Sequence, residues 1–188
     1  ESAQPVLEIQ TVYHRNDPII LGVPPLGGGS DEMARYRAIM RSAMLKHELR
    51  NAGVPDVTQV WCHEVGASRM LHGIAIKQRY PGHARQAALI ASQCRAAALL
   101  TRYVVVVDED VDIWDSNDLL WALCTRTDPA KDIDILRRCW SNPIDPIIPP
   151  SERGFQSRGI IDACKPYEWL RDFPKVSGAS EALKKKVT

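Results

Sequence analysis

The segment Val104–Leu136 reads VVVVDEDVDIWDSNDLLWALCTRTDPAKDIDIL and decides the fold of the chain. Its valines extend a strand, Tyr103–Val107, that is apolar on both faces, as expected of a central parallel strand covered by helices on both sides. An acidic loop follows, and Asp115–Ser116 predicts the cap of a helix over Asn117–Thr125. A strand that ends in polar residues before a helix is typical of α/β proteins, in which this edge of the sheet often holds ligands.

The rest of the sequence extends this pattern to both sides. It predicts an α/β fold with a mostly parallel or mixed sheet covered by helices, in a single domain. Further strands are expected at 19–23, 57–63, 70–77, 133–136 and 159–163. Residues 141–158, which are rich in Pro and Ser, are expected to form a long surface loop.

Two further helices are expected. The first begins after an N-cap at Ser30, ends at Gly53, and places one run of side chains on a single face. These face residues are Met33, Tyr36, Met40, Met44 and His47. The second helix opens at Gly82 and continues to Ala98, and its small alanine side chains would let it lie close to the sheet.

Composition excludes several functional classes. The chain has 188 residues, 45% hydrophobic and 25% charged, with a net charge of +1, which suits one globular domain. This charge argues against nucleic acid or an acidic membrane as the default partner, and no apolar run is long enough to span a bilayer. The five cysteines are odd in number and form no CxxC pair, which favours a reducing cytoplasm over a disulfide framework.

Several motifs fail on inspection. The stretch 22–28 approaches a phosphate loop, but Gly28 stands where the required Lys belongs. An EF-hand is excluded because Ile113 replaces the loop glycine and Leu119 the final glutamate. Cys62 and His63 are neighbours on a strand and therefore point to opposite faces, which argues against a catalytic pair.

The carboxylates of the segment 108–115 leave two interpretations open. Crowded carboxylates need a cation or an N–H donor to compensate their repulsion. A divalent metal is one answer, and a salt-bridge network with Arg126 or Lys131 is the other. By the residue chemistry alone the two are equally supported.

The same residues resemble a known family. Val107–Ile113 followed by Leu120–Pro129 is similar to the C-terminal region of the UbiD decarboxylases, which include ferulic acid decarboxylase. Three other segments resemble that family in the same order along the chain: His14–Ile19, Ala52–Pro55 and Gly159–Pro166. The resemblance divides the chain into an extended lead-in at 1–17, a C-terminal α/β domain at 18–170 and the start of a helical tail at 171–188.

The resemblance implies an activity for a longer parent protein. The family carries out non-oxidative (de)carboxylation of aromatic or α,β-unsaturated carboxylic acids with prenylated FMN, Mn²⁺ and K⁺. An Arg and two Glu residues perform the acid–base chemistry in a separate domain, and the Glu-rich motif of that domain is absent from this sequence. The chain is therefore expected to hold no catalytic, cofactor-binding or metal-binding residue and to be inactive alone.

In this interpretation the chain supplies part of the substrate pocket, contributes contacts in a homo-oligomer and closes over the flavin domain. The expected pocket residues are Val57, Trp61, Asn117, Leu123 and Cys164. The residues Asp108, Asp110, Asp112 and Arg126 are expected to form a structural acidic corner. The alternative is a stand-alone α/β protein that binds a divalent metal through Asp108–Asp115.

Overall fold

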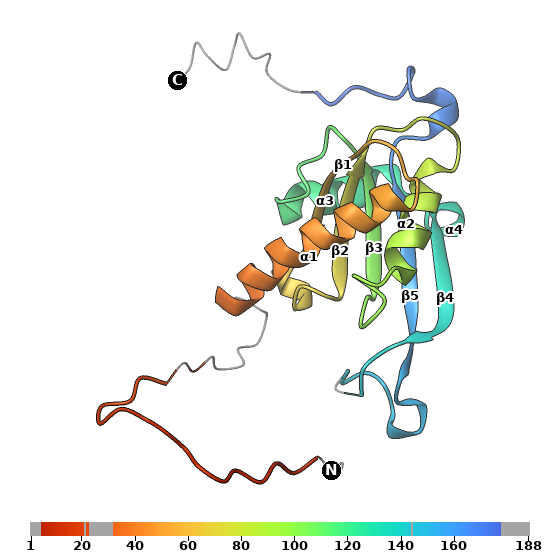
Figure 1. Cartoon of the computed structure of the whole chain (residues 1–188). Helices are drawn as coiled ribbons and strands as arrows, with labels where there is room; N and C mark the ends of the chain where they lie inside the picture. The colour runs from red at the N-terminus through yellow and green to blue at the C-terminus, as the bar shows by residue number, and fades with distance from the viewer. Residues whose placement is uncertain (1–4, 21, 23–31, 144, 178–188) are drawn as a thin grey trace, which may run out of the picture.

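The computed structural model describes residues 5–20, 22, 32–143 and 145–177. Its centre is one five-stranded sheet with the strand order β1-β2-β3-β5-β4 (Figure 1). The strands are β1 (Val57–Cys62), β2 (Leu71–Ile76), β3 (Tyr103–Asp108), β4 (Ile133–Trp140) and β5 (Phe155–Ala163). The α-helices are α1 (Glu32–Asn51), α2 (His83–Gln93), α3 (Ser116–Arg126) and α4 (Pro129–Asp132), with 3₁₀ turns η1 (Glu64–Gly66), η2 (Pro150–Glu152) and η3 (Tyr167–Trp169).

The sheet is mixed, as the sequence predicts. Strand β3 pairs in parallel with both β2 and β5, whereas the outer strands β1 and β4 are antiparallel to their neighbours. The four valines of β3 are buried, two on each face. The expectation of a central strand covered on both sides is therefore confirmed.

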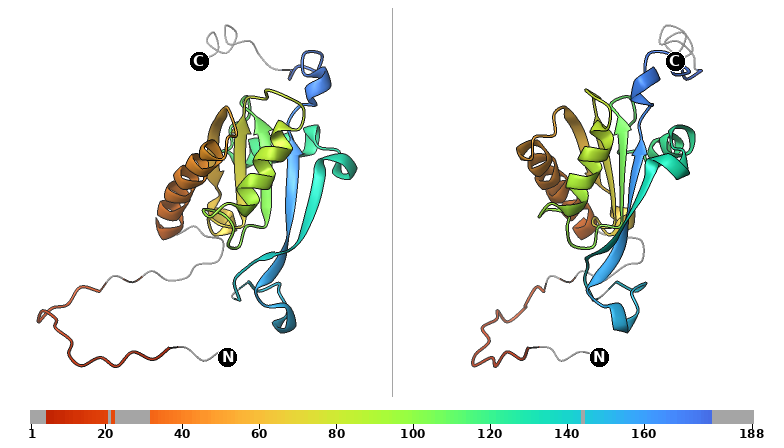
Figure 2. Two further views of the ribbon diagram at one scale, coloured as in Figure 1. Left: turned by 45° about the vertical axis from the view of Figure 1, so that its right-hand side comes forward. Right: turned by 90° about the vertical axis from the view of Figure 1, so that its right-hand side faces the viewer.

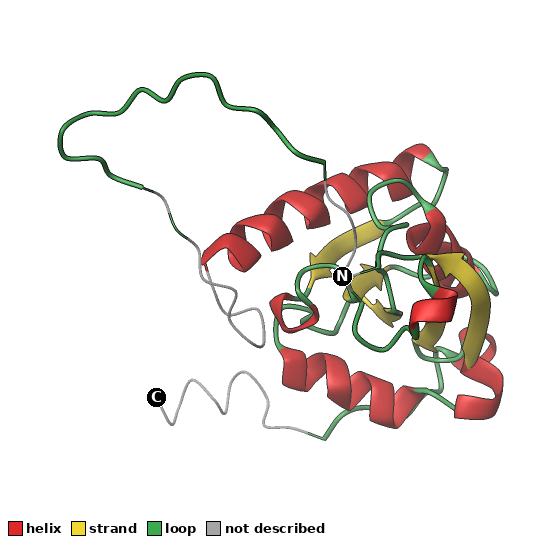
Figure 3. Ribbon diagram, turned by 90° about the horizontal axis from the view of Figure 1, so that it is seen from below, coloured by secondary structure: helices red, strands yellow, loops and turns green. Residues whose placement is uncertain are grey.

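Two apolar cores lie on the two faces of the sheet. Helices α1 and α2 cover one face and α3 covers the other, so the domain has three layers (Figures 2 and 3). In the first core, Leu45 and Leu49 of α1 pack with β-strand residues such as Ile74 and Ile76. In the second core, Trp61 packs with residues of α3 and of the loop before it.

Helix α2 lies close to the sheet through its alanines, as expected. Ala84, Ala87, Ala88 and Ala91 are buried in the first core. The helix ends at Gln93 and not at Ala98, which corrects the predicted boundary. The backbone turns to an extended conformation at Cys94.

The predicted apolar face of α1 is the outer face. Tyr36, Met40, Met44 and His47 are exposed. The buried side consists of smaller or aliphatic residues: Ala34, Ala38, Ser42, Leu45 and Leu49. Small residues let the helix approach β1 closely enough for the Cys62 N–H to donate to Ser42 Oγ at 2.9 Å.

The segment 141–158 is only partly a loop. Strand β4 runs to Trp140 and β5 begins at Phe155, and these two residues pair across the hairpin. The prediction of a loop over the whole segment is wrong at its C-terminal end, because Phe155–Arg158 forms antiparallel pairs that local composition does not reveal.

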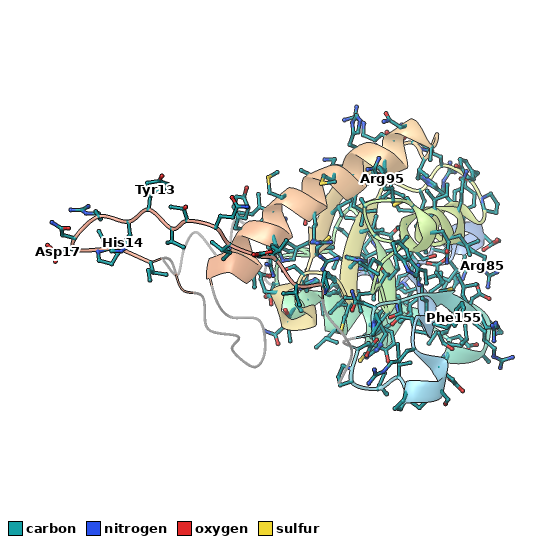
Figure 4. All side chains as sticks on the ribbon, turned by 60° about the horizontal axis from the view of Figure 1, so that its bottom comes forward. Tyr13, His14, Asp17, Arg85, Arg95 and Phe155 are labelled. Atoms are coloured by element: carbon teal, nitrogen blue, oxygen red, sulfur yellow. The ribbon has the colours of Figure 1, made fainter. Side chains whose placement is uncertain are left out.

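The N-terminal residues 5–20 form neither helix nor strand. The side chains of Tyr13, His14 and Asp17 point into open space along this segment (Figure 4). Ile19 and Ile20 are exposed, which contradicts the predicted buried strand at 19–23, while Leu21 and Val23 lie outside the described residues. Ser30, the predicted N-cap, also lies outside them.

At the other end, the described part of the predicted helical tail, residues 171–177, contains no helix. Residues 178–188 lie outside the described part of the chain. Within the ranges that the structure describes, no helix combines the length and the apolar character needed to cross a bilayer.

Candidate functional site

The parallel strands bring three separate segments to one edge of the sheet. Gln78 follows β2, Asp108 ends β3 and Lys165 follows β5. Gln78 Nε2 donates to Asp108 Oδ1 at 2.7 Å, and the Lys165 backbone N–H donates to Asp108 Oδ2 at 2.7 Å. The Asp108 carboxylate therefore ties the ends of β2 and β5 to the end of β3.

Arg126 at the end of α3 completes this arrangement. Its guanidinium donates to both carboxylate oxygens of Asp110, at 2.9 and 3.0 Å, and to Asp108 Oδ2 at 3.2 Å. Lys165 Nζ adds a bond of 2.5 Å to Asp110 Oδ2. Lys131, the other predicted cation, pairs with Asp128 instead. The acidic corner thus consists of Asp108, Asp110, Arg126 and Lys165.

Electrostatics agree with this geometry. Burial raises the pKa of Asp110, but hydrogen bonds and charge from Arg126 and Lys165 outweigh it and lower the pKa to about 2. The Arg126 side chain is only 1% exposed, so its charge depends on these carboxylates for compensation. The two carboxylates and two cations of the acidic corner balance in charge, as in a salt-bridge network.

Asp112 does not belong to the acidic corner, contrary to the prediction. Its Oδ1 accepts from the Trp114 N–H at 2.9 Å, and its own N–H donates to Asp118 at 2.6 Å. Asp115 caps α3 by accepting from the Asn117 N–H at 2.8 Å, as predicted. These carboxylates therefore stabilise the turns of the loop before α3 and the N-terminus of that helix.

The metal interpretation of this loop therefore loses its geometric basis. Within the described part of the chain, no three His, Cys, Asp or Glu side chains gather in a way that could hold a metal ion. The carboxylates of Asp108 and Asp110 are already bound by cations and N–H donors.

The five predicted pocket residues do not line one cavity. Val57 and Cys164 are buried in the core beneath α1 and α2. Trp61 and Leu123 belong to the core beneath α3, on the other side of the sheet, and Asn117 is exposed at the start of α3. The sheet separates the first two residues from the other three.

The α3 side of the domain carries exposed aromatic and aliphatic side chains. Trp114, Leu120 and Trp121 are 54%, 54% and 39% exposed. Trp114 stacks on the buried Trp61 with ring centroids 4.1 Å apart, and Arg126 lies 5.1 Å from the Trp121 ring centroid.

A pocket of about 210 Å³ opens beside the acidic corner. Burial raises the pKa of its Asp162, and the neighbouring Asp132 raises it further. Every cation that lines this pocket is paired with a carboxylate: Arg85, Arg126, Lys131 and Lys165. Among the described residues that line this pocket, no cation is left unpaired to bind a substrate carboxylate.

A second pocket of about 330 Å³ lies at the opposite edge of the sheet. Tyr103, Ile135, Ile147 and Phe155 supply its apolar walls, and the lining Arg102 pairs with Asp145. Sequence reasoning missed this pocket because it assigned Phe155 to a surface loop. The only available signal was the set of large apolar residues among the prolines.

Comparison with known proteins identifies relatives of this domain. A family model described as "3-octaprenyl-4-hydroxybenzoate carboxy-lyase C-terminal domain", UbiD_C, matches residues 36–163. A protein of Archaeoglobus fulgidus, described as uncharacterized, is 30% identical over 192 residues, which cover 97% of this chain and 37% of that protein.

Solved structures agree in fold. The UbiD-class enzyme HmfF from Pelotomaculum thermopropionicum, in complex with FMN, matches with a TM-score of 0.69 at 29% identity, over 78% of this chain and 31% of HmfF. Vanillic acid decarboxylase of Sedimentibacter hydroxybenzoicus in its open form matches with a TM-score of 0.72 at 27% identity, over 93% and 37% of the two chains. This chain spans about a third of the length of each of these relatives.

Proposed function

The chain belongs to the UbiD family of carboxy-lyases, and from this premise we propose that it is the C-terminal domain of a longer decarboxylase. The parent enzyme carries out non-oxidative (de)carboxylation of an aromatic or α,β-unsaturated carboxylic acid with prenylated FMN. The observation that carries the proposal is the family match over 36–163 in a chain about a third as long as its relatives.

The cofactor belongs to the portion of the enzyme outside this chain. The described residues do not fit a site for FMN with Mn²⁺ and K⁺, because they bring no three metal-ligating side chains together and the corner carboxylates are already paired. The structures of relatives named as FMN or prFMN complexes support assigning the flavin to the parent enzyme. This chain then performs no acid–base step.

The role left to the chain is to shape and close the substrate pocket. We place its contribution on the α3 side, where Trp61, Asn117 and Leu123 lie, because large apolar side chains are exposed there. An exposed apolar surface of this kind is suited to cover an aromatic acid and to exclude water from it. Val57 and Cys164, on the other side of the sheet, would act through packing of the first core.

The substrate class is an aromatic acid. The similar enzymes are named for 3,4-dihydroxybenzoic acid and vanillic acid, both phenolic benzoic acids. A homo-oligomer in the cytoplasm completes the proposal. The absence of disulfides among the described cysteines accords with a reducing compartment.

A reconstitution experiment tests this function. The protein is expressed from its natural gene and loaded with prenylated FMN, and CO₂ release is measured from a panel of benzoic and cinnamic acids. The natural protein should bind flavin and decarboxylate at least one of these acids. A natural gene product of the length of this chain alone, or one that binds no flavin, would refute the proposal.

A further inference from the structure

Three arginines gather at the first turns of α1. Arg37 and Arg41 are four residues apart and so lie on one side of the helix. Arg69 lies in the loop after η1, and Ser68 Oγ fixes this loop against the helix by donating to the Ala34 carbonyl at 2.7 Å. The three side chains form the arginine patch of α1.

No carboxylate among the described residues forms an ion pair with any of these three arginines. Arg35, two residues before Arg37 on the same helix, shows the contrast because it pairs with Glu64 at 2.7 Å. Arg41 and Arg69 are partly buried, and burial lowers the pKa of both. Neighbouring arginines lower these pKa values further, so the charges repel one another. Partly buried like charges are costly until a partner compensates them.

The neighbouring surface of α1 is apolar. Tyr36, Ile39, Met40 and Met44 are 62%, 52%, 48% and 52% exposed. Tyr, Met and Arg are the residue types that protein–protein interfaces favour over the remaining surface. Arginine and aromatic side chains also carry much of the binding energy of such interfaces.

We propose that the arginine patch and the Tyr36–Met44 side of α1 dock against a carboxylate-bearing surface of the catalytic portion that precedes this chain. The inference rests on the proposed function, since that function places the catalytic portion before residue 1. In Figure 1, α1 begins at the lower left, on the same side as residues 5–20, whereas β5 ends at the top, at the edge of the sheet that carries the acidic corner. The unpaired positive charge of the patch selects an acidic partner surface, and its position selects the portion joined to the N-terminal segment.

The test measures binding between two purified proteins by calorimetry. One is the 188-residue chain, and the other is the preceding portion encoded by the natural gene. Wild-type binding should weaken as salt increases, because the contact is electrostatic. Arg41→Glu and Arg69→Glu should each weaken binding by at least about tenfold. Arg41→Lys, which keeps the charge, should lose less.

The matched control is Arg171→Glu. Arg171 is an exposed arginine near the C-terminal end of the described chain, and its reversal should leave the affinity unchanged. If Arg41→Glu fails to fold by circular dichroism, the exposed Arg37→Glu replaces it. Equal affinities of the Arg41→Glu, Arg69→Glu and Arg171→Glu chains would overturn the inference. A wild-type chain that prefers a DNA oligonucleotide to the preceding portion would overturn it as well.

The two proposals fail separately. CO₂ release by the natural enzyme, together with docking that ignores charge reversal at the patch, refutes only the docking surface. A natural enzyme without flavin or CO₂ release refutes the proposed function.

Discussion

Arg126 on α3 donates from both guanidinium Nη atoms to the two carboxylate oxygens of Asp110, in the loop after β3, at 2.9 and 3.0 Å. This fork-to-fork geometry fixes the two side chains in orientation as well as in distance. Because Arg126 also reaches Asp108, a single buried cation holds the last turn of α3 to the end of the central strand. The corner between strand, loop and helix depends on that cation.

Removal of the Arg126 side chain should therefore destabilise the domain. Arg126→Ala leaves the buried Asp108 without its cation, and breaking a buried pair in this way costs about 3–5 kcal/mol. Arg126→Lys should recover only part of the loss, because an ammonium group cannot make the bidentate contact. Urea unfolding measures both, with the exposed Arg171→Ala as the control. Equal midpoints for Arg126→Ala and wild type would show that the corner contributes nothing to folding.

The buried arginine of β5, Arg158, should matter as much. It is 1% exposed, and its guanidinium donates to the carbonyls of Ser92, Ala98 and Trp140, the last at 2.7 Å. Arg158→Met would leave these acceptors at the end of α2 and beyond unpaired, at about 1–3 kcal/mol for each buried group. We expect a loss of at least about 3 kcal/mol in unfolding free energy.

Denaturant unfolding checks this, with the exposed Arg153→Met as the matched control. Hydrogen exchange adds a local readout, because protection should fall most at the C-terminal turn of α2. An Arg158→Met chain as stable as the Arg153→Met chain would contradict the stabilising role of Arg158.

The stability of the domain should fall in mild acid because of His72. Burial, with further contributions from the nearby charges of Arg41, His63 and Arg158, lowers its pKa from 6.5 to about 3. In the unfolded chain this histidine takes up a proton below about pH 6.5, whereas in the folded domain it stays neutral until about pH 3. Unfolding free energy should therefore decrease by up to about 1.4 kcal/mol per pH unit from this group as the pH falls between those values.

Urea unfolding of wild type and His72→Gln at a series of pH values measures this slope. Glutamine takes up no proton, so the variant should show a shallower slope over the same window. The pKa values of His63 and His83 are also lowered by burial, so part of the slope should remain. Parallel curves for the two proteins would contradict the role of His72.

Substitutions of the predicted pocket residues should show which side of the sheet contributes to the substrate pocket. In the natural enzyme, Asn117→Ala and Leu123→Ala should lower kcat/KM for the aromatic acid, with little change in melting temperature for the exposed Asn117. Val57→Ala, in the first core, should leave a cavity that lowers the free energy of unfolding by about 1–3 kcal/mol and therefore lowers the melting temperature. Its change in kcat/KM should be smaller. A larger kinetic effect from Val57→Ala than from Leu123→Ala would move the pocket to the other side.

Local sequence patterns predicted the elements whose cause is local. The valine run of β3 is apolar on both faces wherever it lies, and Asp115 caps α3 from the adjacent position. Charge crowding in the acidic loop left a metal or a pairing with Arg126 or Lys131 open, and the structure shows the pairing with Arg126. The part of Lys165 in the same corner was missed, because it contacts Asp110 across 55 residues.

The remaining errors share one physical origin. Met40 and Met44 look like core residues, yet α1 buries the opposite side, because Ala38 and Ser42 allow closer approach to β1. The pairing of Trp140 with Phe155 depends on the register between β4 and β5, and the proline-rich sequence between the two residues gives no sign of it. The substrate pocket was inferred from resemblance alone and stays a prediction; in this domain Val57 and Cys164 lie on one face of the sheet and Trp61 and Leu123 on the other.

The most direct test of the account compares CO₂ release by three samples under identical conditions: the natural full-length protein, its preceding portion alone and the 188-residue chain alone, each incubated with prenylated FMN, Mn²⁺ and K⁺. The account predicts release of CO₂ from an aromatic acid by the full-length protein, little from the preceding portion, and neither flavin absorbance nor CO₂ release from the chain. Flavin binding and decarboxylation by the 188-residue chain on its own would contradict the claim that it is a closing domain without catalytic residues.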